Sequence, residues 1–171
     1  MSDERERKAL YSVQLAGMST ETYTFQFQVD DALMKKYENE EIKAIKAEAT
    51  VELTHRPNVT EADIELVGEV STHCDRCLSL VTFPINLKER AIVKQATKNP
   101  ENEINIIIFD PDKGQIEFDQ YLYDMIVTAL PIQRVHEHEE DCDAEMMDQL
   151  EQNDDQSDEI DPRWNDLKNL I

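Results

Sequence analysis

Apolar and polar side chains alternate along much of the chain, and this pattern predicts several β-strands. Residues 22–29 alternate without interruption, as expected for a strand with one buried face. The same period of two runs through residues 45–53. Turn residues around Pro57 then separate that segment from a further strand at residues 64–70. We expect these three strands to be antiparallel neighbours.

The alternation continues in the second half of the chain. It resumes at Val81, after a pair of cysteines, and extends toward Val93. A short apolar, β-branched run follows at residues 104–109. The segment 110–114, Asp-Pro-Asp-Lys-Gly, is a strong turn signal and is expected to end that strand.

Two segments have the period of a helix. Asp30 or Asp31 can cap a short helix that extends to Tyr37. Asp119 can cap a longer helix that Pro131 stops. The apolar residues on one face of this longer helix are Leu122, Met125, Ile126, Ala129 and Leu130. Together the elements predict an α+β fold: an antiparallel, partly barrel-like sheet with the longer helix packed on it.

The C-terminal third of the chain departs from these patterns. Residues 139–160 are strongly acidic and contain no aromatic residue, so we expect disorder or a frayed helix there. Beyond them, Asp161-Pro162 starts a last amphipathic helix that has Trp164, Leu167 and Ile171 on one face. The predicted organisation is a core domain at 1–138 that includes the cysteine pair, an acidic tail at 139–160 and a short helix at 161–171.

The terminal segment has two interpretations. An apolar face at the end of a flexible acidic spacer is how a tethered docking motif is built, so Trp164, Leu167 and Ile171 are candidate partner-docking residues. Alternatively, Trp164 folds back onto the body of the protein.

The net charge of the chain bears on whether its partner is a nucleic acid or a protein. The chain of 171 residues carries a net charge of −21, and residues 137–161 contain 13 acidic residues and no Lys or Arg, which leaves −8 for the rest. Proteins that bind a polyanion usually have a basic stripe, since Lys and Arg contacts to phosphate supply most of the affinity. Here basic residues occur only in scattered pairs. Direct binding to a nucleic-acid duplex is disfavoured, and a basic protein partner is favoured. Solubility alone is the simpler explanation of the acidic run.

Length and hydropathy predict one soluble domain with appendages. A chain of this size can bury one sizeable core but not two. No apolar run approaches the roughly 18 residues that cross a bilayer, so we expect a cytoplasmic protein without membrane contact. Three cysteines cannot all pair within one chain, which also favours a reducing compartment.

The cysteines and two histidines predict a metal site. Cys74 and Cys77 have the Cys-x-x-Cys spacing that lets two thiolates from one turn bind one metal ion. Cys142 offers a third thiolate, and His136 or, as an alternative, His138 offers an imidazole. Three cysteines and one histidine fill the tetrahedral shell of Zn²⁺ and leave no open position, so the predicted zinc is structural rather than catalytic.

Other interpretations of these residues stay open. Cys74 and Cys77 could form a redox dithiol or be buried, inert thiols. The strand that follows them differs from the helix that follows a thioredoxin-like pair. The histidines near Cys142 could be exposed, because acidic neighbours favour the protonated imidazole and oppose metal binding. His73 is a further possible ligand, and His55 is expected at a surface turn.

No catalytic motif is present. With three glycines, the chain cannot form a P-loop, a dinucleotide-binding fingerprint or a nucleophile elbow. Asp110 and Asp112 are better explained by the turn than as a carboxylate dyad. We therefore expect a protein that is not an enzyme.

Three landmarks together resemble the YceD family of large ribosomal RNA subunit accumulation proteins. They are the Cys-x-x-Cys-Leu turn at 74–78, the helix ending in Ala129-Leu130-Pro131 with His136 and Cys142 after it, and the terminal Asp161-Pro162-Arg163-Trp164 with Leu167. Each motif is short, but their order and spacing cover residues 10–171.

This resemblance implies a non-enzymatic cytoplasmic factor that supports the level of large-subunit ribosomal RNA and ribosome assembly. It places Cys74, Cys77, His136 and Cys142 at the cysteine and histidine positions of the family. The negative charge then points to contact with a basic ribosomal protein or a pre-ribosomal particle of the large subunit, with indirect association to ribosomal RNA. The alternatives are a thiol-redox protein that uses Cys74 and Cys77, and an acidic interaction adaptor unrelated to ribosomes.

Overall fold

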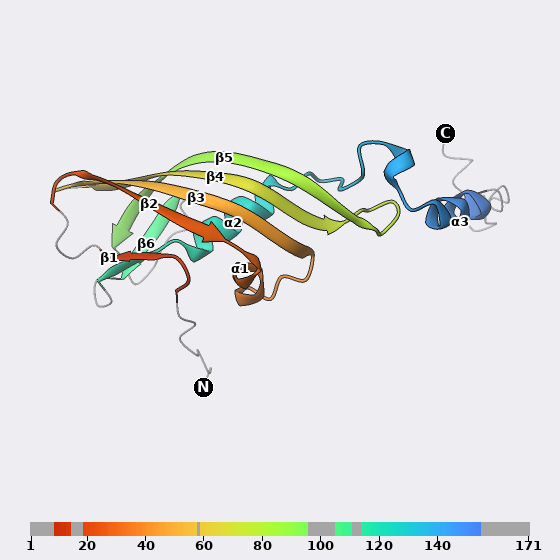
Figure 1. Ribbon diagram of the computed structural model, residues 1–171. Helices are drawn as coiled ribbons and strands as arrows, with labels where there is room; N and C mark the ends of the chain where they lie inside the picture. Colours follow the sequence, from red (N-terminus) through yellow and green to blue (C-terminus); the bar gives the residue numbers. More distant parts are fainter. Residues whose placement is uncertain (1–8, 15–18, 58, 96–104, 111–113, 155–171) are drawn as a thin grey trace, which may run out of the picture. The chain divides into compact units, whose positions relative to one another are not determined.

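The computed structural model describes residues 9–14, 19–57, 59–95, 105–110 and 114–154 (Figure 1). Contacts divide the chain into two compact units. The first comprises Met1–Thr72 and Thr82–Ile132, and the second comprises His73–Val81 and Gln133–Ile171. The turn with the first two cysteines, expected within a core domain at 1–138, therefore groups with the C-terminal residues.

The first unit contains a curled sheet that forms a half-barrel (Figure 1). In the part of the chain that is described, seven strands follow the order β1-β7-β6-β5-β4-β3-β2. Their bounds are β1 Ser12–Gln14, β2 Thr22–Val29, β3 Ile42–Arg56, β4 Val59–His73, β5 Leu80–Gln95, β6 Ile106–Asp110 and β7 Gln115–Glu117. With its helices this sheet confirms the predicted α+β class.

One strand pair corrects the expectation of a purely antiparallel sheet. β5 and β6 are parallel, with Ile92 opposite Ile106 and Val93 opposite Ile107. Ten residues of sequence separate these two strands, more than a hairpin turn needs. The sheet is therefore mixed. Alternation within each segment predicted both strands, but it carries no information on their relative direction.

Two short strands were not predicted. β1 pairs with β7, with Ser12 opposite Glu117 and Val13 opposite Ile116. Each has three residues, which is too few for alternation to be recognised, and their pairing spans about a hundred positions of sequence.

The two helices of the first unit start where the sequence predicted. α1 spans Asp31–Lys36, and the carboxylate of Asp30 caps it by accepting from the Ala32 N–H at 2.9 Å. α2 spans Asp119–Ala129, but its N-cap is Phe118, and Asp119 does not cap it. The buried Asp119 carboxylate instead accepts from the N–H groups of Leu10 and Tyr11 at 2.8 and 2.7 Å. The residue expected to cap α2 thus links the start of α2 to residues 10–11 by hydrogen bonds.

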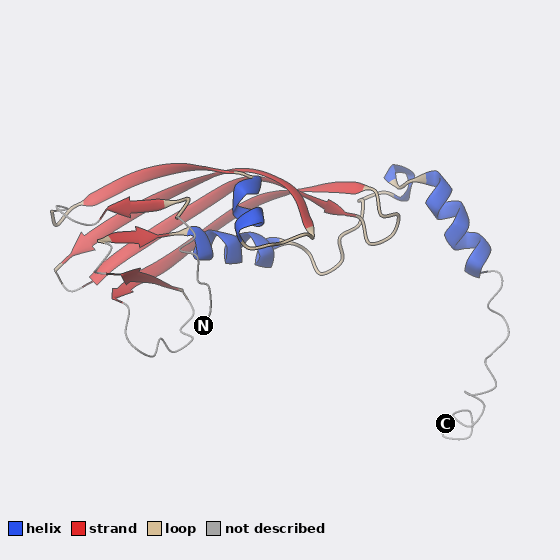
Figure 2. Ribbon diagram, turned by 90° about the horizontal axis from the view of Figure 1, so that it is seen from below, coloured by secondary structure: helices blue, strands red, loops and turns tan. Residues whose placement is uncertain are grey.

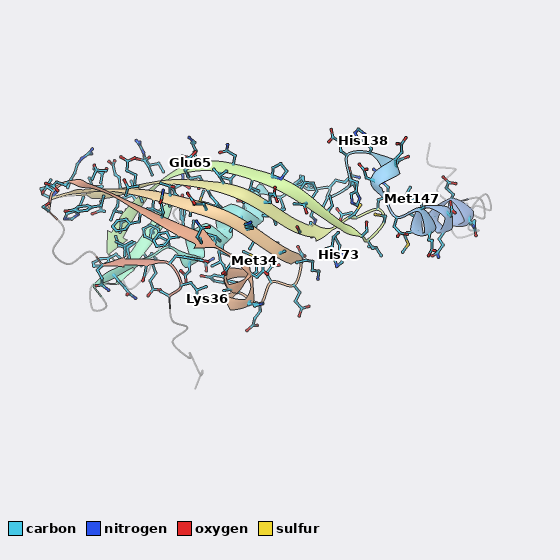
Figure 3. All side chains as sticks on the ribbon, viewed as in Figure 1. Met34, Lys36, Glu65, His73, His138 and Met147 are labelled. Carbon is cyan, nitrogen blue, oxygen red and sulfur yellow. The ribbon has the colours of Figure 1, made fainter. Side chains whose placement is uncertain are left out.

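Both helices lie against one face of the half-barrel (Figures 1 and 2). On α2 the buried apolar residues Leu122, Met125 and Ile126 belong to the predicted face. They pack with the inner faces of β3 and β4, where Val51, Leu53, Ala62, Ile64 and Leu66 are almost completely buried. Burying a large apolar side chain contributes about 1.5–3 kcal/mol. Figure 3 shows Met34 and Lys36 on the side of the helices and Glu65 on the opposite side.

The second unit contains the cysteine turn, the 3₁₀ helix η1 at Glu139–Asp141 and the helix α3 at Ala144–Asp154. α3 occupies much of the segment expected to be disordered or a frayed helix. Asp143 begins it by accepting from the Met146 N–H at 3.0 Å, and strong helix formers such as Ala144 and Glu145 follow. Residues 155–171, with Trp164, Leu167 and Ile171, lie outside the described residues.

Candidate metal centre

A tight turn between β4 and β5 positions the first two cysteines. The Cys74 N–H donates to the Ser79 carbonyl oxygen at 2.8 Å, and the Leu78 N–H donates to the Cys74 carbonyl oxygen at 3.0 Å. Leu78 has φ of 61°, in the left-handed region. This conformation costs about 1–2 kcal/mol for an L-residue, and it closes the turn so that Cys74 and Cys77 are both buried.

A clamp between Asp75 and Arg134 attaches a distant segment to this turn. The Asp75 N–H donates to the Arg134 carbonyl oxygen, and the Arg134 N–H donates to the Asp75 carboxylate, both at 2.7 Å. His136 follows two residues later. η1 then turns the chain back, since the Cys142 N–H donates to the Glu139 carbonyl oxygen at 3.0 Å. Residues about sixty positions apart thereby meet.

Four donor atoms face one another at this point. The sulfurs of Cys74, Cys77 and Cys142 and a ring nitrogen of His136 all lie within 4.8 Å of one another. His136 Nδ1 is 3.6 Å from the Sγ atoms of both Cys77 and Cys142. A tetrahedral Zn²⁺ with ordinary bond lengths holds a sulfur and a nitrogen about 3.5 Å apart. The spacing therefore fits a tetrahedral metal ion.

The second ring nitrogen orients the imidazole for ligation. His136 Nε2 lies 3.2 Å from the Leu80 carbonyl oxygen, which can only accept a hydrogen bond. In the neutral ring Nε2 therefore carries the proton, and the lone pair of Nδ1 faces the sulfurs. Metal-binding histidines usually have such a partner on the other nitrogen.

The sulfurs influence one another's ionisation. Burial raises the pKa of the Cys77 thiol, but hydrogen bonds from Ser79 and from backbone N–H groups outweigh burial and lower this pKa to about 6. Burial, followed by the nearby Cys77 and Cys74, raises the pKa of Cys142 to about 11. Three thiolates in one small buried space repel each other. A divalent cation would remove this repulsion and favour deprotonation of all three.

Arg76 also belongs to the centre. Its guanidinium lies 3.9 Å from Cys142 Sγ and 3.2 Å from a carboxylate oxygen of Glu139. The Arg76 side chain is 26% exposed and is therefore partly covered by these contacts rather than fully solvated. Its N–H groups can stabilise a thiolate at Cys142 and hold η1 against the turn.

The other histidines lie outside this group of four. His138, the alternative ligand, is exposed. His73 Nδ1 donates to the Leu78 carbonyl oxygen at 2.7 Å, and His55 lies in the hairpin between β3 and β4, 2.8 Å from the Thr60 hydroxyl. The supporting roles of Ser79, Asp75 and the Leu80 carbonyl had no signal in the sequence, because backbone bonds between distant segments leave no local pattern.

A family model described as "Large ribosomal RNA subunit accumulation protein YceD" matches residues 62–171. This is well over half of the chain, and it includes all four residues of the centre. The chain belongs to the YceD family. The resemblance inferred from the landmarks is therefore confirmed, and membership supports a role in the accumulation of large-subunit ribosomal RNA.

The YceD match starts within β4 and continues to the end of the chain. α1, β1, β2 and β3 precede it. Searches among curated proteins and among solved structures gave no match. Among the described helices, none is both long and apolar enough to span a membrane.

Proposed function

We propose that this YceD-family chain supports large-subunit ribosomal RNA accumulation and ribosome assembly in the cytoplasm, by contacting a basic ribosomal protein or a pre-ribosomal particle and without catalysing a reaction. In this proposal its association with ribosomal RNA is indirect. The observation that carries it is the combination of family membership with a net charge of −21. An acidic surface attracts basic proteins and repels RNA phosphates.

The outer face of the sheet supports this choice of partner. β4 presents four acidic side chains on this face: Glu61, Asp63, Glu65 and Glu69. Three cations lie beside them in ion pairs: Arg56 with Glu61 at 3.0 Å, Arg90 with Asp63 at 2.6 Å and Lys88 with Glu65 at 2.9 Å. A phosphate would have to compete with these carboxylates for the basic side chains.

Affinity purification of the full chain at low salt, with identification of both RNA and protein, tests the proposal. We expect basic large-subunit proteins among the recovered species and no recovery of protein-free ribosomal RNA. A variant with Glu145, Asp148 and Glu151 changed to Gln, Asn and Gln should recover less of them, because it removes three charges from α3. Recovery of naked ribosomal RNA with a steep salt dependence and no basic protein would contradict the proposal. Partners unrelated to ribosomes would favour the adaptor alternative.

We also propose that Cys74, Cys77, His136 and Cys142 bind a structural Zn²⁺. The support is the donor set, the spacing that fits a tetrahedron and the orientation of the His136 ring. When bound, the ion would supply a cross-link between the turn and the segment after α2, and four protein ligands leave no position for a substrate.

A thiol-redox role is a second candidate, favoured by the pKa of about 6 at Cys77 next to Cys74. The burial of both thiols counts against it, since reactive cysteines are usually partly exposed. The rate of alkylation as a function of pH separates the two. Rapid modification of Cys77 near neutral pH in the metal-loaded protein would favour redox chemistry.

The terminal segment is proposed as a partner-docking motif on the strength of its sequence pattern. Deleting residues 161–171 should reduce recovery of the partner, because Trp164, Leu167 and Ile171 would supply the apolar contact. The melting temperature should not change. A lower melting temperature with unchanged recovery would instead favour the alternative in which Trp164 packs on the body of the protein.

A further inference from the structure

β2 forms one edge of the sheet, and its composition is unusual for an edge strand. Its eight residues, Thr-Tyr-Thr-Phe-Gln-Phe-Gln-Val, contain no charged residue, no proline and no glycine, in a chain in which 32% of the residues are charged. Edge strands normally carry charges, prolines or bulges that prevent another strand from pairing with them. Within its eight residues β2 has none of these protections.

The register identifies which backbone groups of β2 face the open edge. The His55 N–H donates to the Glu21 carbonyl oxygen at 3.1 Å, which extends the pairing of β2 with β3 by one step. Hydrogen-bonded pairs alternate along antiparallel strands, so Tyr23, Phe25 and Phe27 bond to β3. The backbone N–H and C=O groups of Thr22, Thr24 and Gln26 therefore point away from β3. In the described part of the chain, no backbone hydrogen bond reaches them.

The side chains of β2 determine what an added strand would contact. Thr22, Thr24 and Gln26 are exposed on the outer face, whereas Phe25 and Phe27 are half-buried and pack against the core. A strand added at this edge would place alternate residues against the aromatic rings and the others in solvent. An extended segment that alternates apolar and polar residues fits these requirements.

Tyr11 limits how far such a strand can extend. Its ring lies 5.7 Å from that of Phe27, and its hydroxyl oxygen lies 3.4 Å from the Asp30 nitrogen. The Val29 end of β2 is therefore close to Tyr11. Thr22, Thr24 and Gln26 precede Phe27 in the strand, and they are the part of the edge considered for an added strand.

Charge around the edge selects the partner. Glu21 precedes β2, and Asp30 and Asp31 follow it, while Glu48 and Glu52 are exposed on the adjacent β3 opposite Gln28 and Thr24. The exposed Lys46 of β3 lies beyond the Val29 end of β2, away from Thr22 and Thr24. A second copy pairing through β2 would bring two edges with the same excess of acidic residues together, and this repulsion disfavours it. A basic segment would be attracted instead, because Glu48 and Glu52 would lie about 10 Å from an added strand.

We propose that the edge of β2, at Thr22, Thr24 and Gln26, binds an extended basic segment of a partner protein by β-strand addition. The inference rests on the proposed contact with a basic ribosomal protein and adds where on the chain that partner binds and in which conformation. Main-chain hydrogen bonds would provide affinity, and alternation of Lys or Arg with apolar residues would provide selectivity.

Titration of the full chain with two synthetic octapeptides tests this binding. One alternates Lys and Val, and the other alternates Glu and Val. We expect the Lys/Val peptide to bind at least about tenfold more tightly than the Glu/Val peptide. Gln26→Pro removes an N–H that points to the open edge and no ladder bond to β3, so the sheet should persist while Lys/Val binding falls by about tenfold or more.

A charge-matched pair of variants distinguishes strand addition from general attraction. Gln26→Lys and Asn86→Lys each add one positive charge to the outer face of the sheet, the first on β2 and the second on β5. Gln26→Lys should weaken Lys/Val binding severalfold, and Asn86→Lys should change it by less than about twofold. Equal effects of the two, or unchanged binding in a folded Gln26→Pro variant, would overturn the inference. So would concentration-dependent dimerisation of the parent chain that Gln26→Pro abolishes, because the occupant would then be a second copy.

Low-salt purification with Gln26→Pro separates this inference from the proposed function. If the parent chain and the variant both recover basic large-subunit proteins, the proposed function stands and the β2 edge is not the contact. If only the parent chain recovers them, the proposed function and the assignment of the contact to the β2 edge both stand. If neither does, the proposed function fails, whatever the peptides show.

Discussion

His136 and His138 are two positions apart, and only one of them has the environment of a ligand. Both have acidic neighbours in the sequence, and both are within six positions of Cys142. The backbone around Arg134 brings His136 against the sulfurs, with Nδ1 facing them and Nε2 facing a carbonyl oxygen. A difference of two residues thus decides between a ligand and an exposed imidazole.

Replacing His136 and replacing His138 should change the metal content of the protein differently. We expect the full chain, purified under reducing conditions without chelator, to contain about one zinc ion, and His136→Ala to lose most of it. His138→Ala should retain the metal, which makes it the matched control. Elemental analysis with competition by a chelator measures both. Less than about 0.2 zinc per parent chain would exclude a high-affinity site.

Removing the buried negative charge of Asp119 should have a large effect on the free energy of unfolding. Its carboxylate accepts from two N–H groups and pairs with Lys36, and both side chains are largely buried. Asp119→Asn should lower the free energy of unfolding by about 2–4 kcal/mol, because the buried ion pair with Lys36 loses its negative charge and one N–H loses its acceptor. Urea denaturation measures the change.

The control for this substitution is an exposed ion pair. Asp63 pairs with Arg90, and the two side chains are 44% and 68% exposed. Asp63→Asn should change the free energy of unfolding by no more than about 1 kcal/mol, since solvent screens the pair. Similar losses for both variants would show that burial of the Asp119 pair has no special role.

At the scale of elements, Gly68 determines how closely β3 and β4 approach. It lies opposite Ala47, and a Cβ atom built on it would lie 2.3 Å from the Lys46 carbonyl oxygen and 2.4 Å from the Ala47 Cα atom. Both are backbone atoms, so the contact cannot be relieved by moving a side chain. A glycine inside a strand often marks such an approach.

Gly68→Ala should therefore destabilise the sheet by about 3 kcal/mol or more, because the two strands would have to separate. The adjacent Val67→Ala is the control, since Val67 is 45% exposed and its truncation should cost less than about 1 kcal/mol. Thermal or urea unfolding of the two variants measures the difference. A Gly68→Ala variant as stable as the parent would show that β3 and β4 can separate at little cost.

For the whole molecule, the division into two compact units makes metal removal a local event. The proposed ligands all belong to the second unit, while the core of β3, β4 and α2 belongs to the first. Chelation should increase amide hydrogen exchange in residues 74–80 and 134–142 and leave the amides around Leu53 and Leu66 protected. Loss of protection throughout the chain would show instead that the metal stabilises both units together.

Most of the first unit could be predicted because its signals are local. The alternation at 22–29 gave β2 with its true ends, and Asp30 proved to be the cap of α1. β1 and β7 were missed, because a pairing of three-residue strands about a hundred positions apart leaves no periodic trace. α3 was only partly anticipated, since its acidic composition argued against burial while its residues favour helix.

The order of residues along the chain is enough to predict the periods of most strands and helices, the excess of negative charge and a set of thiols and imidazoles with metal-binding chemistry. These are properties of single residues and of neighbours a few positions apart. Contacts made only in the folded chain set the parallel pairing of β5 with β6, the hydrogen bonds from Leu10 and Tyr11 to Asp119, and the place of Arg76 beside Cys142. Such contacts also place His136, rather than His138, against the three cysteine sulfurs. Each of these depends on which distant backbone groups meet, and no local pattern carries that information.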